Sequence, residues 1–266
     1  MSGGMSVPAP PTVAVTVDHV DLTYPKNPAV LTDVHLTVPA GEHLAVIGRS
    51  GCGKSTLLHL IGGLLTPTAG DISVLGDAEA ADRLSHCALM PQGDSLLPWF
   101  TVRDNVAVPL RNRGVARRVA RERATAMLER CGLGAWATSR PSELSGGMRQ
   151  RAALARALLA DKPVLLADEP LGALDAITRG EIQDWLSELL TGTGATLVMV
   201  THDVDEALLL ADRVVLLADG AVAGDWPGWF SRRVGRPRSD VLADPDFAAA
   251  RAEILRCLGN VKGATA

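Results

Sequence analysis

The run from Gly48 to Thr56 contains the residues best suited to bind a phosphate. It reads Gly48-Arg49-Ser50-Gly51-Cys52-Gly53-Lys54-Ser55-Thr56 and follows the phosphate-loop pattern G-x-x-x-x-G-K-[ST]. A strand-like apolar run (residues 44–47) precedes it and a helix-like run (56–61) follows. The glycines permit a tight turn that points backbone N–H groups inward, and the helix adds its positive N-terminal end. Lys54 is therefore placed to reach nucleotide phosphates and Ser55 to ligate Mg²⁺; a Gly/Ser-rich turn without a ligand is the alternative.

A second helix start suited to an anion follows Leu144. The sequence there is Leu144-Ser145-Gly146-Gly147-Met148-Arg149-Gln150, ahead of a helix-like stretch. Ser145 is expected to be the N-cap, and Gly146 and Gly147 leave the first backbone N–H groups accessible. Taken alone, the motif also describes an ordinary capped helix after a turn.

Two carboxylates end the apolar run of residues 163–167. Asp168 and Glu169 fit catalytic groups at the C-terminal end of a buried parallel strand. Asp168 is suited to hold Mg²⁺ through water, and Glu169 to act as general base on an attacking water. Solvated loop acids are the alternative, which the phosphate loop in the same chain disfavours.

Together these motifs resemble the ABC-transporter ATPases, whose signature reads LSGGQ or LSGGM. The resemblance covers residues 13 to 258. It implies an α/β fold: a P-loop NTPase (RecA-like) parallel core sheet, N-terminal antiparallel strands and an inserted helical subdomain. It also implies ATP and Mg²⁺ as cofactors and a dimer of two cassettes. In that dimer the signature of one copy, at Ser145, serves the nucleotide held by the partner's Lys54.

Three more residues each match a single functional position of that family. Gln92 matches the glutamine that senses Mg²⁺ and the γ-phosphate, and His202, after an apolar run (196–200), matches the switch histidine. Tyr24, the only tyrosine, matches the aromatic that stacks on adenine, although an ordinary hydrophobic cover is an open alternative. The resemblance thus implies catalytic and metal-binding roles for a small set of side chains: Glu169, His202 and Gln92 for catalysis, and Ser55, Gln92 and Asp168 for the metal. The nucleotide-binding set it implies is Tyr24, Gly48, Arg49, Ser50, Gly51, Cys52, Gly53, Lys54, Ser55, Thr56, Ser145, Gly146 and Gly147.

Composition agrees with a globular nucleotide-binding protein. Hydrophobic residues make up 47% of the 266-residue chain, and its net charge of −4 argues against nucleic acid as a partner. No apolar stretch approaches the roughly 20 residues that span a bilayer, and the N-terminus lacks the regions of a secretory signal. Cys52, Cys87, Cys131 and Cys257 show no C-x-x-C spacing and are expected to be reduced thiols of a cytosolic protein.

The order of strand-like and helix-like segments along the chain predicts the domain organisation. Strands are expected over residues 13–20, 31–38, 44–47, 88–91, 164–167, 196–200 and 213–217, and helices over 111–131, 179–190, 205–211 and 245–258. A helical stretch from 93 to 157 interrupts a parallel sheet. We therefore expect a disordered tail (1–12), one ATPase domain (13–240) with its helical subdomain (93–157), and a C-terminal helix and tail (241–266).

Other segments indicate a subfamily. The string 95–106, SLLPWFTVRDNV, and the string 171–179, LGALDAITR, are similar to the nitrate/sulfonate/taurine group of importer ATPases. Leu171 and Pro91 replace phenylalanines usual in that group, at non-catalytic positions. Leu-Leu-Pro-Trp (96–99) is expected to be an exposed apolar loop that marks a binding surface, unless Trp99 packs into the helical lobe.

This resemblance implies an ATPase subunit at the cytoplasmic face of the cell membrane. Its expected partners are a second cassette, membrane permease subunits and, indirectly, a solute-binding protein. Alternatives are the ATPase of another small-molecule importer, a soluble ABC ATPase of DNA repair or translation, and a P-loop kinase. A kinase does not explain Ser145-Gly146-Gly147 or His202.

Overall fold

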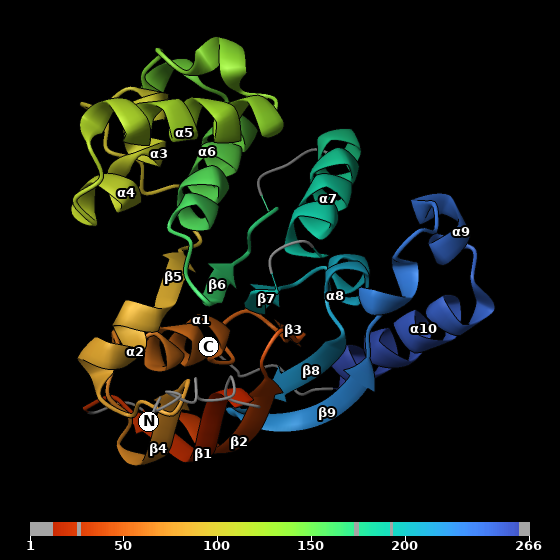
Figure 1. Cartoon of the computed structure of the whole chain (residues 1–266). Helices are drawn as coiled ribbons and strands as arrows, with labels where there is room; N and C mark the ends of the chain where they lie inside the picture. The colour runs from red at the N-terminus through yellow and green to blue at the C-terminus, as the bar shows by residue number, and fades with distance from the viewer. Residues whose placement is uncertain (1–12, 26–27, 173–175, 192–193, 261–266) are drawn as a thin grey trace, which may run out of the picture.

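The computed structural model describes residues 13–25, 28–172, 176–191 and 194–260. Two sheets and a set of surrounding helices form the chain (Figure 1). The expected tail at 1–12, the last residues 261–266 and positions 173–175 of the 171–179 string lie outside the described residues. In the part of the chain that is described, no helix is both long and apolar enough to cross a membrane.

A six-stranded sheet in the order β5-β6-β7-β3-β8-β9 forms the centre. All neighbouring pairs are parallel except β8 and β9, which are antiparallel. Residues of β3 (His43–Ile47), β6 (Val164–Asp168) and β7 (Thr196–Thr201) are buried throughout, as expected for strands covered on both faces. The other strands are β5 (Cys87–Met90), β8 (Arg213–Ala218) and β9 (Ala221–Pro227).

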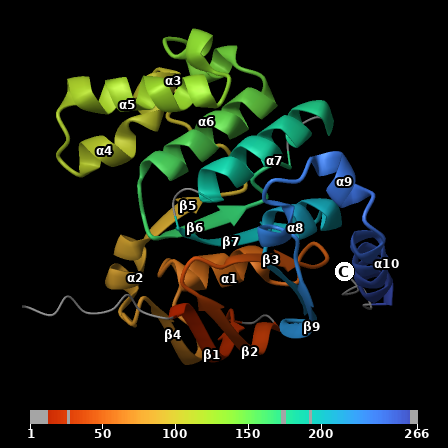
Figure 2. The same ribbon diagram turned by 45° about the vertical axis from the view of Figure 1, so that its right-hand side comes forward.

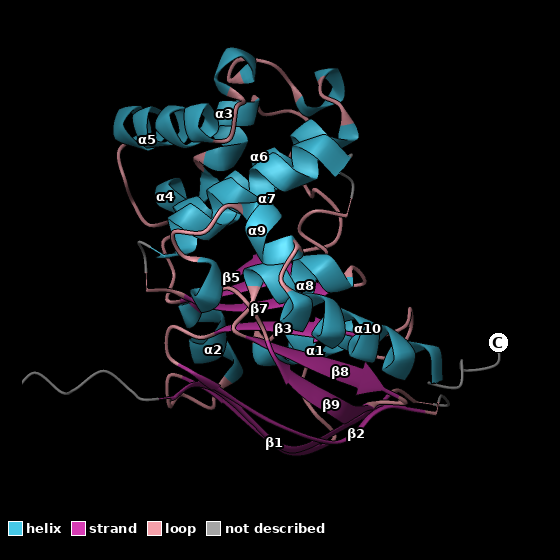
Figure 3. Cartoon of the chain, turned by 90° about the vertical axis from the view of Figure 1, so that its right-hand side faces the viewer, coloured by secondary structure: helices cyan, strands magenta, loops and turns pink. Residues whose placement is uncertain are grey.

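A smaller antiparallel sheet in the order β2-β1-β4 lies across from the central sheet, with α1 (Lys54–Ile61) between the two (Figures 2 and 3). Its strands are β1 (Val13–Thr23), β2 (Ala29–Pro39) and β4 (Ala69–Val74). Leu57, Leu58, Leu60 and Ile61 of α1 are buried in one hydrophobic core with side chains of both sheets. Each such side chain contributes about 1.5–3 kcal/mol by leaving water, so the helix is fixed firmly behind the phosphate loop.

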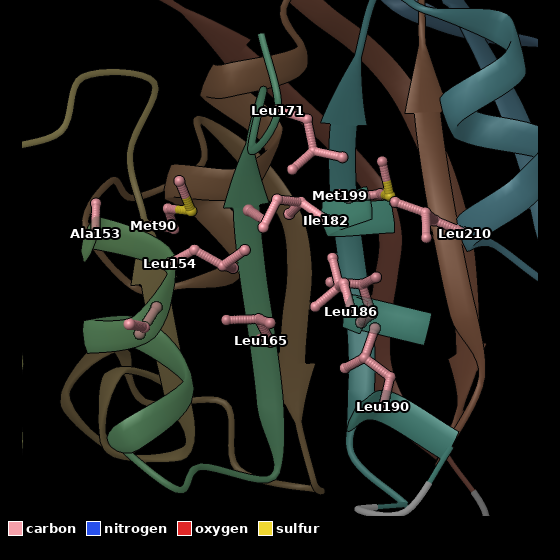
Figure 4. Close-up of a cluster of buried hydrophobic side chains, with 14 of the residues drawn as sticks. Met90, Ala153, Leu154, Leu165, Leu171, Ile182, Leu186, Leu190, Met199 and Leu210 are labelled. Atoms are coloured by element: carbon pink, nitrogen blue, oxygen red, sulfur yellow. The ribbon is translucent and has the colours of Figure 1, made fainter. Parts of the chain in front are cut away.

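A second core covers the opposite face of the central sheet. Figure 4 shows part of it: Leu154 of α6, Leu165 of β6 and Met199 of β7 lie in one apolar layer with Leu186 of α7. The helices on this side are α6 (Gly146–Leu159), α7 (Ala176–Thr191), α8 (Val204–Leu210), α9 (Arg238–Leu242) and α10 (Pro245–Asn260). Alternate buried residues of β3, β6, β7 and β8 therefore belong to two different cores.

The helical lobe, drawn at the upper left of Figure 1, is built from α3 (Val102–Val106), α4 (Val108–Asn112), α5 (Arg117–Arg130) and α6. The expectation of one helix over 111–131 is wrong. α4 ends at Asn112, and Gly114 then adopts a left-handed φ of 79° before α5 begins at Arg117. A glycine at this position lets the chain turn so that α4 and α5 both pack on α6.

Candidate functional site

The phosphate loop connects β3 to α1, and two of its glycines are required by close contacts. A Cβ on Gly48 would lie 2.3 Å from the carbonyl oxygen of Leu217, and one on Gly53 would lie 2.7 Å from Leu31 Cδ2. Gly53 is also the N-cap of α1 and adopts a left-handed φ of 102°. The loop is thus packed against β8 and β2, which gives it a fixed shape.

Lys54 is buried at the start of α1 and points back into this loop. Its Nζ donates hydrogen bonds to the carbonyl oxygens of Gly48 at 2.8 Å and Arg49 at 2.9 Å. The residue is only 7% exposed. Lys54 is the first residue of α1, where the N–H groups of the first turn have no partners within the helix. These N–H groups and one ammonium form a site for a phosphate.

A pocket of about 420 Å³ opens in front of the loop. Its lining residues are Val30, Ser50, Gly51, Gly53, Lys54, Ser55, Thr56, Gln92, Glu169 and His202. Gln92, Glu169 and His202 each follow the C-terminal end of a parallel strand: β5, β6 and β7. Ligands bind at this edge in open α/β sheets, so the sheet itself gathers these three side chains opposite the loop.

Glu169 lies at the centre of this group. Its Oε2 accepts a hydrogen bond from Gln92 Nε2 at 3.2 Å, and its Oε1 lies 3.2 Å from His202 Nδ1. The Glu169 side chain is 22% exposed and the His202 side chain 64% exposed, so the carboxylate is accessible to water. A carboxylate oriented by two polar neighbours and open to water is suited to position and deprotonate that water.

The backbone of Glu169 is held in a strained conformation. Its φ of 49° is left-handed, which is uncommon for a residue with a side chain. The N–H of Glu169 donates to the Val200 carbonyl at 2.8 Å, and its own carbonyl accepts from Gln150 Nε2 at 2.6 Å. Such strain persists only where the surroundings impose it, and it is characteristic of functional sites.

The remaining predicted residues are not among the lining residues of this pocket. Asp168 is buried at the end of β6, one residue before Glu169. Tyr24 is partly exposed after β1 and is not among the lining residues. Ser145 is the N-cap of α6, as predicted: its Oγ accepts from the N–H of Met148 at 3.3 Å, and Gly146 and Gly147 form the first turn. Gly48, Arg49 and Cys52 belong to the loop but also do not line the pocket.

Two contributors to the site were not predicted from the sequence. Val30, near the start of β2, supplies an apolar wall of the pocket, and no local motif marks it. Gln150 holds the backbone of Glu169, and its only signal in the sequence is its place in the Leu144–Gln150 motif. Both contacts join segments that are far apart in the chain.

A buried acid contacts Thr201, the residue before His202. Glu206 of α8 is 2% exposed, and its Oε2 accepts a hydrogen bond from Thr201 Oγ1 at 3.0 Å. Burial raises the pKa of Glu206 to about 8, against the hydrogen bond from Thr201, which lowers it. The carboxyl group is therefore mostly protonated at neutral pH.

We expect Glu206 to make folding stability fall with rising pH. Its folded pKa of about 8 lies above the ordinary 4.5, so its contribution is full below pH 4.5 and is lost as pH rises to 8. Glu206→Gln replaces the titrating carboxyl group with an amide. The difference in unfolding free energy between wild type and variant should therefore change by up to about 1.4 kcal/mol per pH unit between pH 4.5 and 8. Urea unfolding of both proteins from pH 5 to 9 measures it. If the unfolding free energies of the two proteins changed in parallel with pH, Glu206 would not be protonated in the folded state.

Comparison with known proteins agrees with the geometry. The ABC transporter family profile matches residues 31–172. The chain belongs to the ABC transporter family. A taurine import ATP-binding protein of Mesorhizobium japonicum is 44% identical over 248 residues, which cover 90% of this chain and 95% of the relative. An aliphatic sulfonates import ATP-binding protein of Pseudomonas fluorescens is 44% identical, with 88% of this chain and 82% of the relative covered.

A solved structure shares the fold. The ATP-binding cassette MJ0796, in a dimeric post-hydrolysis state with ADP and Pi, matches with a TM-score of 0.74 and 33% identity. The match covers 80% of this chain and 98% of that one. This ABC family member is therefore an ATP-binding α/β cassette with ATPase activity, and the predicted family and fold class are confirmed.

Proposed function

We propose that this ABC cassette hydrolyses ATP to energise uptake of a small oxyanion-type solute, such as a sulfonate, taurine or nitrate, through a membrane permease. One observation carries the catalytic part: Lys54, Gln92, Glu169 and His202 converge on a single pocket. The names of the 44%-identical taurine and sulfonate relatives support the transport part. An importer of another small solute is the second candidate, since the pocket binds nucleotide rather than cargo.

In this proposal the loop and Lys54 bind the β- and γ-phosphates, and Tyr24 stacks on adenine. Ser55, Gln92 and Asp168 fit a Mg²⁺ ion, because hydroxyl, amide and carboxylate oxygens are the hard ligands it prefers. The ion would neutralise charge on the transferred phosphoryl group. Glu169 accepts the proton of the attacking water, while His202 contacts the γ-phosphate and orients that water.

The proposed working unit is a dimer of two cassettes at the cytoplasmic face of the membrane. The pocket is partly open to solvent, and Ser145, Gly146 and Gly147, which form a second anion-binding helix start, are not among its lining residues. Two copies placed head to tail bring each signature onto the other copy's nucleotide. The similar cassette MJ0796 is dimeric in its structure with ADP and Pi, which supports a dimer as the working unit.

The permease contact is proposed at Trp99 in the helical lobe. The expectation that the whole 96–99 loop is exposed is wrong: Leu96 is 8% exposed, and the N–H of Leu97 donates to Asn105 Oδ1 at 2.6 Å. These interactions fold the first half of the loop inward, while Trp99 remains 65% exposed. The loop begins shortly after Gln92, so a change at the γ-phosphate would reach the membrane partner through it.

We expect Trp99→Ala to reduce solute uptake about tenfold, as loss of a large aromatic anchor at an interface does, while ATP hydrolysis by the isolated subunit is unchanged. Uptake in cells and phosphate release by purified protein measure the two effects. Trp136→Ala is the matched control, because Trp136 is 40% exposed in the same lobe but outside the loop. Normal uptake by the Trp99 variant would contradict the proposal.

The transport function is tested by growth. A deletion strain should lose growth on taurine or alkanesulfonates as sole sulfur source, or on nitrate as sole nitrogen source, and regain it with the wild-type gene. Complementation by Lys54→Ala, which should lose ATP binding, should fail. Normal growth of the deletion strain on all three would favour the second candidate.

A further inference from the structure

Two irregularities on neighbouring strands bring two histidines and two aspartates together. Between the pairs Val17–Leu36 and Val20–Val34, β1 has one residue more than β2. Between Val20–Val34 and Leu22–Leu31, β2 has the extra residue. His19 has a φ of 49° and Asp33 a φ of 50°, as residues in β-bulges can.

In a regular strand, adjacent side chains point to opposite faces of the sheet. These bulges interrupt that alternation. Asp18 and His19 are adjacent in sequence, yet both are exposed, and the exposed His35 lies opposite them. Figure 3 shows β1 and β2 at the lower edge of the molecule, far from the helical lobe. The cluster is therefore on the solvent face of the small sheet, opposite the face that packs on α1. Bulges often re-aim side chains in this way next to functional sites.

The distances in the cluster suit a metal ion. One ligand atom from each of Asp18, His19 and His35 lies within 4.8 Å of the others, and within the described part of the chain no second group of this kind is found. His35 Nδ1 lies 3.0 Å and His19 Nε2 3.9 Å from Asp18 Oδ1. Ligands about 2.1 Å from a tetrahedral ion are about 3.4 Å apart, so small side-chain rotations suffice.

A second carboxylate orients one of the histidines. Asp33 Oδ1 lies 2.6 Å from His19 Nδ1, which leaves Nε2 directed toward Asp18. Metal-binding histidines commonly donate their other ring N–H to a carboxylate in this way. Asp33 is itself fixed, because its backbone N–H donates to Asp21 Oδ1 at 2.7 Å.

The local field favours positive charge. Two carboxylates lie beside the His19 ring: Asp33 Oδ1 is 2.6 Å from Nδ1, and Asp18 Oδ1 is 3.9 Å from Nε2. Asp71 is paired directly with Asp18 across β1 and β4, which adds another exposed carboxylate. A divalent cation gains from the same carboxylates, provided that the imidazoles are neutral.

We propose that Asp18, His19 and His35 form a binding site for a divalent transition-metal ion of the zinc class, with Asp33 as the carboxylate that orients His19. Imidazole ligands suit zinc and nickel, and zinc also binds Asp or Glu oxygens. On binding, any proton shared between His35 Nδ1 and Asp18 leaves to solvent, and the freed lone pair coordinates the ion. Water completes the coordination on the exposed side. The ion would join β1 to β2.

The test is titration of the metal-free, nucleotide-free full chain with Co²⁺, followed by visible absorption, and with Zn²⁺, followed by calorimetry. We expect one ion per chain. His19→Asn, which tolerates the left-handed backbone, and His35→Gln should each weaken binding at least about tenfold, and Asp33→Asn should weaken it several-fold. His86→Gln should bind like wild type, because His86 pairs with Asp77 at 2.7 Å outside the cluster.

Two results would overturn the site. One is the absence of saturable binding to the wild type. The other is binding that persists unchanged in the His19→Asn, His35→Gln double variant, including binding with a thiolate-to-cobalt charge-transfer band, which would place the ion on cysteine. Circular dichroism of each variant verifies that it is folded, so loss of binding reports on the ligands.

Discussion

Glu169→Gln should bind ATP normally and hydrolyse it roughly 10²- to 10⁴-fold more slowly than wild type, the range expected for loss of a general base. The amide keeps the size of the side chain that contacts Gln92 at 3.2 Å and lies 3.2 Å from His202. It cannot accept the proton of the attacking water. Because ATP then remains intact between two cassettes, the variant should accumulate as a dimer. Phosphate release and light scattering with ATP measure the two effects.

Lys54→Ala is the informative comparison for Glu169→Gln. It removes the ammonium that lies against the loop carbonyls of Gly48 and Arg49, so it should weaken ATP binding itself and give no dimer. A Glu169→Gln protein with normal hydrolysis would exclude Glu169 as the base. One that hydrolyses slowly but stays monomeric with ATP, even with its permease present, would argue against the dimer.

Ser145→Arg should abolish ATP-dependent dimerisation and hydrolysis while leaving ATP binding by the single cassette intact. Ser145 caps α6 outside the pocket lining, so its substitution does not alter the chain's own nucleotide site. A bulky cation at this helix start would obstruct the approach of the other copy's γ-phosphate. Nucleotide-binding titrations, sizing and phosphate release measure the three properties.

Ser145→Ala separates this steric effect from the loss of the helix cap. Its expected cost is about 1 kcal/mol of stability, because Met148 N–H loses its acceptor, with a smaller loss of hydrolysis than Ser145→Arg. Normal hydrolysis by Ser145→Arg would remove the basis for a signature that acts on the partner's nucleotide.

Most of the central sheet could be predicted because its strands are short apolar runs that end in polar, chemically informative residues. The predicted strand at 164–167 is β6 (Val164–Asp168), and that at 196–200 is β7 (Thr196–Thr201). Two strands were not predicted. β4 begins with three exposed residues, and β9 is an edge strand with no buried position, so neither shows a clear hydrophobic period.

The site was predictable where backbone geometry alone gathers the side chains. Gln92, Glu169 and His202 follow three parallel strands, whose carboxyl ends meet at one edge. The wall at Val30, the left-handed Glu169 and the burial of Leu96 were not predictable. Each depends on packing between segments remote in sequence, which leaves no local pattern.

The position of α1 between two sheets links nucleotide affinity to the cooperativity of unfolding. The helix that receives the phosphates is also the layer on which the β2-β1-β4 sheet rests, through Leu57 and Leu58. That sheet therefore cannot separate from the molecule as an independent unit without exposing α1. ATP at 100 times its dissociation constant stabilises the folded cassette by about 2.7 kcal/mol. By the same linkage, amide hydrogens of β1 and β2 should exchange more slowly when ATP is bound, although Val30 is the one residue of these two strands that lines the pocket.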